Sequence, residues 1–211
     1  MTTVRIGSIC FLACIVGTVV SGFLGQFAFS SAGNGGYAAV LTDPRYRLAG
    51  VIVTIDLILQ GVGFGLVAYL LAMIFRFPAW LAFGCLLAGN LLGVVSNGSE
   101  LWNSIASQSA ESLAYDSTFF SMMDLVLLPL QMIGFGIFGV LLVANRAIPF
   151  GCICLLAIPE IMFALYCMHG VDVSVQKALF WIEVAYNTVL CLAGVLWLQS
   201  QRIHPSRAVG A

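Results

Sequence analysis

Residues 119–144 read FFSMMDLVLLPLQMIGFGIFGVLLVA, a run of 26 positions with one charged residue, Asp124. An α-helix needs about 20 apolar residues to cross the hydrocarbon core of a bilayer, so this run predicts a membrane-spanning helix. Strands of a membrane barrel would instead alternate over roughly ten residues. Five further long apolar runs predict helices of the same kind, at Ile6–Phe29, Leu48–Phe75, Ala79–Val95, Ile148–Met168 and Ala178–Leu198.

The composition of the whole chain agrees with this prediction. Of its 211 residues, 61% are hydrophobic and 8% are charged, whereas a soluble domain has about 25% charged residues. So few charges cannot cover a water-facing surface. We therefore expect one all-α domain over residues 1–211, a polytopic membrane bundle of six transmembrane helices. The first run is too long for the apolar part of a typical signal peptide, so we expect it to be retained.

The distribution of positive charge predicts the orientation. Six spans place both termini on one side of the membrane, and loops on the cytoplasmic side are usually rich in Lys and Arg. With the termini inside, five basic residues lie inside and three lie outside. The inner set is Arg5, Arg76, Arg146, Arg202 and Arg207, and the outer set is Arg45, Arg47 and Lys177. We therefore expect a multi-pass protein of a bacterial inner membrane with cytoplasmic termini.

Two features of the predicted helix arrangement can each be interpreted in two ways. The segment Ser96–Thr118 is a long connection without Lys or Arg, and it predicts either an interfacial helix or lid, or a solvated loop with Trp102 at the headgroups. In addition, QGVGFG at 60–65 aligns with QMIGFG at 131–136, and the same offset aligns Pro78 with Pro149. This pattern indicates either an internal two-helix repeat or a coincidence in a glycine-rich chain.

Four acidic residues lie inside the predicted spans. They are Asp56, Asp124, Glu160 and Glu183, and no Lys, Arg or His lies deep in a span to neutralise them. A carboxylate in the bilayer core costs at least a few kcal/mol, so such a residue is a functional candidate by default. At about 1.5 Å per residue, all four fall in the outer half of the bundle. Gln60, Asn90, Gln131 and Asn187 fall in the same half.

These depths predict one polar pocket beneath the outer surface, in which Asp56 and Glu160 meet. Pro129 and Pro159 interrupt the hydrogen bonding of their helices beside the acids, which favours a cavity there. The alternative is that these residues have structural roles only. Asp124 and Glu183 would then be solvated near the membrane interface, and the amides would form hydrogen bonds between helices.

The chemistry of such a pocket is that of an acid and a base. Carboxyl groups in a medium of low dielectric constant, close to one another, are expected to be partly protonated at neutral pH. A protonated carboxyl beside an ionised one is a general acid/base pair. Aromatic faces stabilise cations, and four aromatic residues lie near the last two acids in sequence: Phe163, Tyr166, Trp181 and Tyr186. Lipid contact is the alternative role for each of these aromatic residues.

Other chemistries find little support in the sequence. The only histidines are His169 and His204, so we expect no metal site, and no motif indicates a cofactor. The seven cysteines lie in apolar runs without a CxxC pair, which is typical of small packing residues. A net charge of −1 without a basic cluster excludes nucleic acid as a partner. The expected partners are a lipophilic small molecule, membrane lipid and, in the carrier alternative, further copies of the chain.

Short stretches resemble a known group of proteins. Arg5-Ile6-Gly7, Arg47-Leu48-Ala49-Gly50 and the turn from Gly136-Ile137-Phe138-Gly139 to Arg146-Ala147-Ile148-Pro149 are similar to small bacterial six-helix membrane proteins of the domain-of-unknown-function type. This resemblance implies a bacterial inner membrane and no particular activity. In chemistry alone, the acids and aromatic residues resemble the membrane-bound terpene cyclases of meroterpenoid pathways, from which no residue role is carried over.

The sequence thus favours a membrane enzyme that acts on a lipophilic, neutral substrate. Proton-initiated isomerisation, cyclisation or hydration of an isoprenoid-like molecule fits the residues best. Glu160 or Asp56 would donate the proton, and Asp124 or Glu183 would be the base or an orienting partner. Two alternatives stay open: a proton-coupled carrier or channel for a small neutral or cationic solute, and an accessory membrane subunit.

Overall fold

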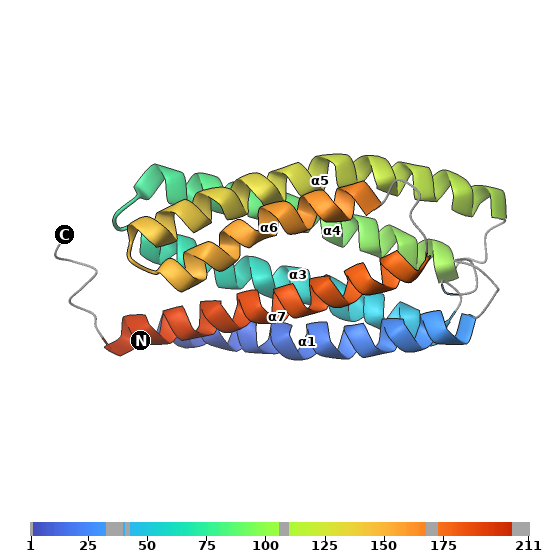
Figure 1. Ribbon diagram of the computed structural model, residues 1–211, viewed down its shortest axis with the longest axis horizontal. Coiled ribbons are helices and arrows are strands. Elements are labelled where there is room, and N and C mark those ends of the chain that lie inside the picture. The colour runs from blue at the N-terminus through green and yellow to red at the C-terminus, as the bar shows by residue number, and fades with distance from the viewer. Residues whose placement is uncertain (1, 33–39, 41–42, 106–109, 168–172, 204–211) are drawn as a thin grey trace.

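The computed structural model describes residues 2–32, 40, 43–105, 110–167 and 173–203, and side chains within 3–31, 40, 43–99, 126–163 and 181–201. Within this part the chain is all-α and forms six helices (Figure 1). They are α1 (Thr2–Ala32), α3 (Pro44–Leu71), α4 (Arg76–Ile105), α5 (Ala110–Ala144), α6 (Ile148–Cys167) and α7 (Val173–Ile203).

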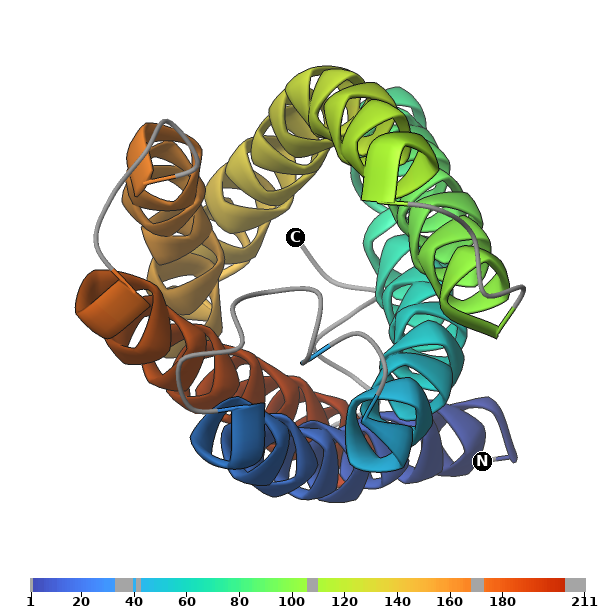
Figure 2. The same cartoon turned by 90° about the vertical axis from the view of Figure 1, so that its right-hand side faces the viewer.

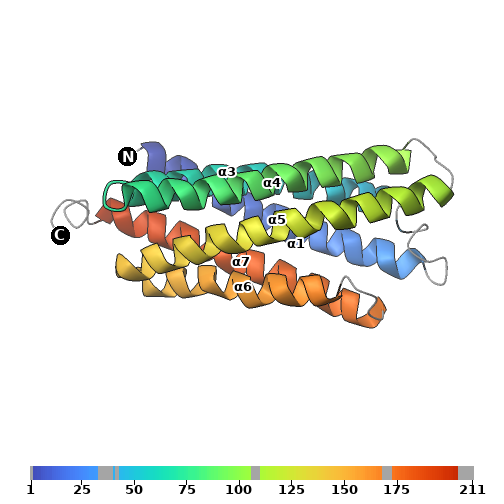
Figure 3. The same ribbon diagram turned by 90° about the horizontal axis from the view of Figure 1, so that it is seen from above.

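The helices form a ring in which each packs on its neighbours in the chain. Seen end-on, α1, α3, α4, α5, α6 and α7 follow one another around the ring, and α7 returns to α1 (Figure 2). The contact between α6 and α7 is the least extensive of the six. The start of α1, the end of α7 and the two short turns lie at one end of the bundle, here called the terminal end (Figures 1 and 3). The opposite end is called the far end.

Local sequence explains where the helices begin and end. Asp43 caps α3 by accepting a hydrogen bond from the backbone nitrogen of Arg45 at 2.8 Å, and Pro44 occupies the first turn, where its missing N–H is not needed. The hydrogen bonds from Arg45 hold the pKa of the Asp43 carboxyl below its ordinary value. At the terminal end, Arg146 turns the chain between α5 and α6 with a positive φ of 58°.

The observed bounds differ from the predicted runs at two places. The second helix ends at Leu71 rather than Phe75. Arg76-Phe77-Pro78, which separates the second and third predicted runs, instead begins α4, since proline is tolerated in the first turn of a helix. Residues 96–105 continue α4 and residues 110–118 belong to α5, so most of the predicted connection extends the two helices toward the far end (Figure 3).

Aromatic side chains fill the interior near the terminal end. Phe64 is 1% exposed, and its ring centroid lies 5.4 Å from those of Phe11, Phe135 and Phe138 and 6.3 Å from that of Phe150. These five residues, from α1, α3, α5 and α6, are called the aromatic core.

Glycines make room for this packing. A Cβ at Gly63 on α3 or at Gly194 on α7 would lie 2.7 Å from the ring of Phe11. The ring of Phe11 therefore fits between two helices only because both lack a side chain there.

The outer surface of the ring is apolar. On α1 the exposed large side chains recur every three or four residues and form one face: Ile9, Leu12, Val16, Val20, Phe23 and Phe27. Other helices also expose large apolar side chains, and a continuous apolar surface of this kind is suited to lipid rather than water. Five helices are long and apolar enough to cross a membrane, and α6 has the shorter apolar stretch.

Candidate functional site

The polar side chains of the bundle gather on the far-end side of the aromatic core. Within the described residues, no charged side chain is fully buried, and Asp56, Glu160 and Glu183 are each half-buried. They are therefore less enclosed than the predicted pocket requires. Asp56 lies eight residues from Phe64 along α3, or roughly 12 Å farther from the terminal end at 1.5 Å per residue.

Asp56 packs against α1. The hydroxyl of Thr18 donates to Oδ2 of Asp56 at 3.5 Å, and the thiol of Cys14 approaches the backbone oxygen of Asp56 at 3.4 Å. A Cβ added at Gly17 would overlap both carboxylate oxygens of Asp56. The carboxylate thus occupies the space that a glycine leaves on the neighbouring helix, and a side chain at position 17 would displace it.

Glu160 on α6 and Glu183 on α7 form a second group. Their carboxyl groups are close enough to interact electrostatically. The phenol of Tyr186 lies within electrostatic reach of Glu160 and donates a hydrogen bond to the backbone oxygen of Ile153 at 3.1 Å. This hydrogen bond joins α7 to α6 seven residues before Glu160 along α6, or roughly 10 Å nearer the terminal end. The chain has no Lys, Arg or His between Arg146 and His169, and the first basic residue before Glu183 is Lys177.

Two amides link three helices next to Asp56. Nε2 of Gln131 on α5 donates to Oδ1 of Asn90 on α4 at 3.2 Å, and Nδ2 of Asn90 donates to the backbone oxygen of Leu57 on α3 at 3.0 Å. Asn90 is 4% exposed, so these hydrogen bonds satisfy an amide that is nearly free of solvent. Together these three groups form the polar layer: Thr18, Asp56, Asn90, Gln131, Glu160, Glu183 and Tyr186.

The structure thus brings some of the predicted residues together and separates others. Glu160 and Glu183 lie within electrostatic reach of each other, and Asn90 and Gln131 share a hydrogen bond. In the described part of the chain, no hydrogen bond or electrostatic interaction joins Asp56 to Glu160, since Asp56 faces α1 and Glu160 interacts with α7. A shared site for Asp56 and Glu160 stays a prediction.

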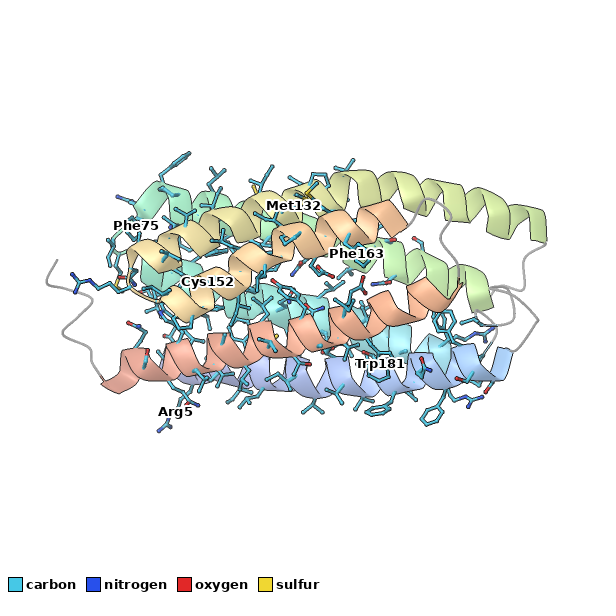
Figure 4. All side chains as sticks on the ribbon, in the orientation of Figure 1. Arg5, Phe75, Met132, Cys152, Phe163 and Trp181 are labelled. Atoms are coloured by element: carbon cyan, nitrogen blue, oxygen red, sulfur yellow. The ribbon has the colours of Figure 1, made fainter. Side chains whose placement is uncertain are left out.

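The remaining candidates are placed as follows. Gln60 and Asn187 are half-buried. Phe163 and Trp181 are exposed toward the far ends of α6 and α7, and the ring of Trp181 meets that of Phe23 edge-on at 5.6 Å (Figure 4). Asp124 and Tyr166 lie in α5 and α6, but their side chains fall outside the described residues.

The contacts of Asp56 include residues that sequence reasoning missed. Gly17 and Thr18 are adjacent small residues in the middle of an apolar helix, which is the only signal that could have pointed to them. The predicted packing role of the cysteines holds in part: Cys10, Cys14, Cys154 and Cys191 are buried, Cys85 is half-buried and Cys152 is exposed. Among the described residues no cluster of metal-ligating side chains occurs.

No protein family model matches this chain, and neither a curated protein nor a solved structure is similar to it. The resemblance to small bacterial six-helix membrane proteins therefore stays a prediction. What the fold defines is a class: five long apolar helices indicate a multi-pass membrane protein.

Proposed function

We propose that this protein is a membrane enzyme in which Glu160 and Glu183 act as a general acid/base pair on a lipophilic, neutral substrate. The observation that carries the proposal is that these two carboxyl groups lie within electrostatic reach of each other on adjacent helices. Around Glu160 the sequence has no basic residue between Arg146 and His169. Two carboxylates within electrostatic reach in a medium of low dielectric constant repel each other, which favours a state in which one carboxyl is protonated and the other ionised.

In this proposal all six helices cross the membrane with cytoplasmic termini. The 20 residues of α6 reach about 30 Å, which equals the thickness of a typical hydrocarbon core. The terminal end, which carries Arg5, Arg76 and Arg146, then faces the cytoplasm. The polar layer lies nearer the outer surface.

The reaction follows from the chemistry of the pair. The protonated carboxyl of Glu160 gives its proton to a carbon–carbon double bond, and a carbocation forms on the neighbouring carbon. Glu183, as carboxylate, then removes a proton from an adjacent carbon, which moves the double bond and leaves the substrate formula unchanged. Capture by a second double bond before proton loss gives a ring, and capture by water gives an alcohol.

Two neighbouring features support a lipophilic substrate. The seam between α6 and α7, which carries both glutamates, is the least extensively packed in the ring. Phe163 is exposed on α6, whereas Trp181 of α7 packs edge-on against Phe23 of α1 and so lies at the contact of α7 with α1. A molecule dissolved in the bilayer could therefore approach the acids from the side, past the ring of Phe163, whose face can stabilise a cation.

The test is turnover by the purified protein in nanodiscs. Geraniol, farnesol and geranylgeraniol are the first probes, and products are detected by mass spectrometry as isomers or as species heavier by one water. Because each variant removes one member of the pair, Glu160→Gln and Glu183→Gln should each lower the rate by about 10²-fold or more. Glu100→Gln, near the far end of α4, is the matched control and should retain the wild-type rate.

Wild-type rates in both site variants would refute the assignment. Movement of a probe across proteoliposomes without chemical change would instead favour a carrier. A protein that copurifies in fixed ratio, with neither conversion nor transport, would favour an accessory subunit.

A further inference from the structure

The ring of helices raises a question that is independent of the proposed reaction, namely what closes its interior. Each helix packs mainly on its two neighbours in the ring, and no described helix runs along the axis (Figure 2). Side chains alone must therefore prevent water and ions from passing between the two ends.

The aromatic core is placed to do this. Its members come from α1, α3, α5 and α6 and meet around Phe64. Phe11, Phe64 and Phe138 are at most 1% exposed. Trp197 of α7 extends the cluster, because its ring lies 6.0 Å from that of Phe150.

The backbones of two neighbouring helices fix the position of the Phe11 ring. Its ring lies against Gly63 on one side and Gly194 on the other, at distances that leave no room for a Cβ on either helix. The ring is thereby held between α3 and α7. In contrast, the side chains of the polar layer are polar and mostly half-buried.

We infer that the aromatic core is a permeability barrier, which isolates the polar layer from the terminal end and leaves it accessible from the far end. The five phenylalanine rings of the aromatic core have no polar atom to carry water or a proton past them. Any proton that reaches the acids from water therefore comes from the far end.

The first experiment measures proton leak. The full-length protein is reconstituted in vesicles loaded with a pH-sensitive dye, and a pH gradient is applied in the presence of valinomycin. Wild-type vesicles should be about as tight as protein-free ones. Phe64→Ala should leak several-fold faster, and Phe11→Ala/Phe64→Ala faster still. Phe27→Ala is the matched control, because Phe27 lies on the outer face of α1 and is 56% exposed.

A second experiment leaves all five rings of the aromatic core in place. Thr18→Cys and Ser8→Cys, in a chain whose seven native cysteines are replaced by alanine, place thiols on opposite sides of the barrier. Arg5→Cys and Arg45→Cys mark the terminal and far ends, since both arginines are exposed. A membrane-impermeant thiosulfonate should modify Thr18→Cys only from the side that modifies Arg45→Cys.

Three results would overturn the inference: modification of Thr18→Cys from the terminal end, no modification of it from the far end, or wild-type tightness of the folded double variant. Each of these results leaves the proposed acid/base reaction untouched, because that reaction is tested by turnover of the glutamate variants.

Discussion

The two halves of this bundle are built by the same helices and differ in what lies between them. Toward the terminal end, the interior is a close-packed aromatic core with phenylalanines seated against glycines. Toward the far end, α3, α4, α5, α6 and α7 present acids or amides, and most of these are half-buried. The first half has the properties of a structural core, because its aromatic side chains are almost completely buried against one another.

The second half has the opposite character. Glu160 and Glu183 lie within electrostatic reach of each other, where like charges repel, and Asp56 rests on Gly17 without a basic partner in its hydrogen bonds. Arrangements that cost stability without improving packing are expected at functional sites rather than in structural cores. Together with the proposed function, the comparison predicts that the terminal half provides stability and the far half provides chemistry, and each variant below tests one side of this prediction.

The largest expected effect is in the aromatic core. Phe64→Ala removes a ring that touches four others, so we expect the free energy of unfolding to fall by about 3–5 kcal/mol. Unfolding in detergent mixtures, followed by circular dichroism, measures the change. Phe27→Ala, on the lipid-facing side of α1, should cost much less. Equal losses in the two variants would show that the terminal half is not the stabilising half.

A smaller effect is expected where α1 meets Asp56. Gly17→Ala forces the carboxylate to move, which should destabilise the fold by about 1–3 kcal/mol. Combining it with Asp56→Ala should restore most of the loss, because the shorter side chain leaves room for the new methyl group. Gly84→Ala is the matched control: nothing lies within 4 Å of a Cβ there, so it should be neutral or stabilise by up to about 1 kcal/mol. If the effects of Gly17→Ala and Asp56→Ala on the free energy of unfolding were additive, the contact between Gly17 and the Asp56 carboxylate would be contradicted.

The helices themselves could be predicted from the sequence because length and apolar composition determine them. All six predicted runs lie largely within observed helices, and the turn at Arg146 falls where it was expected. The break between the second and third predicted runs, residues 76–78, is misplaced: α3 ends at Leu71, and Pro78 lies in the first turn of α4. For residues 96–105 the sequence leaves an interfacial helix and a loop open, because polar residues in a helix that continues beyond the bilayer resemble a loop; in the structure these residues continue α4.

The pairing of the acids could not be predicted in the same way. In a helix that is apolar on all sides, the hydrophobic pattern does not indicate which face is turned inward. Depth along the helix was therefore available from the sequence, but rotation was not. Asp56 and Glu160 were assigned to one pocket by depth, and only the rotation of α3 shows that Asp56 faces Gly17 and Thr18.

The amides of the far half should contribute little to stability. The chain from Gln131 through Asn90 to the backbone of Leu57 is a hydrogen-bonded link between helices, and such links in membranes are worth about 0.6 kcal/mol on average. A double-mutant cycle with Asn90→Leu and Gln131→Leu should give a coupling energy near that value. A coupling well above about 2 kcal/mol would make this half a structural core as well.

The smallest effect concerns Asp43, the one acid in this comparison with an arginine partner, at the far end outside the spans. Hydrogen bonds from Arg45, including a side-chain contact of 3.0 Å, lower the pKa of Asp43 in the folded protein below its ordinary value of 3.8. A lowered folded pKa stabilises the fold above the ordinary value, and this contribution is lost as the pH falls through the folded pKa. Thermal unfolding measured from about pH 5 to pH 2 should therefore show a slightly steeper acid decline in the wild type than in Asp43→Asn, which keeps a capping side chain.

Arg45→Ala should reduce the same slope, because it removes the guanidinium while leaving the backbone hydrogen bond to Asp43 in place. If neither variant changed the slope, the pairing of Asp43 with Arg45 would contribute nothing to the stability of the fold, although Asp43 has both solvent and a cation next to it. The presence of a basic partner would then not explain why Asp43 differs from Glu160 and Glu183. A measurable change in both variants would keep that contrast: Asp43 stabilises its helix together with its partner, whereas the described interactions of Glu160 and Glu183 include no basic side chain.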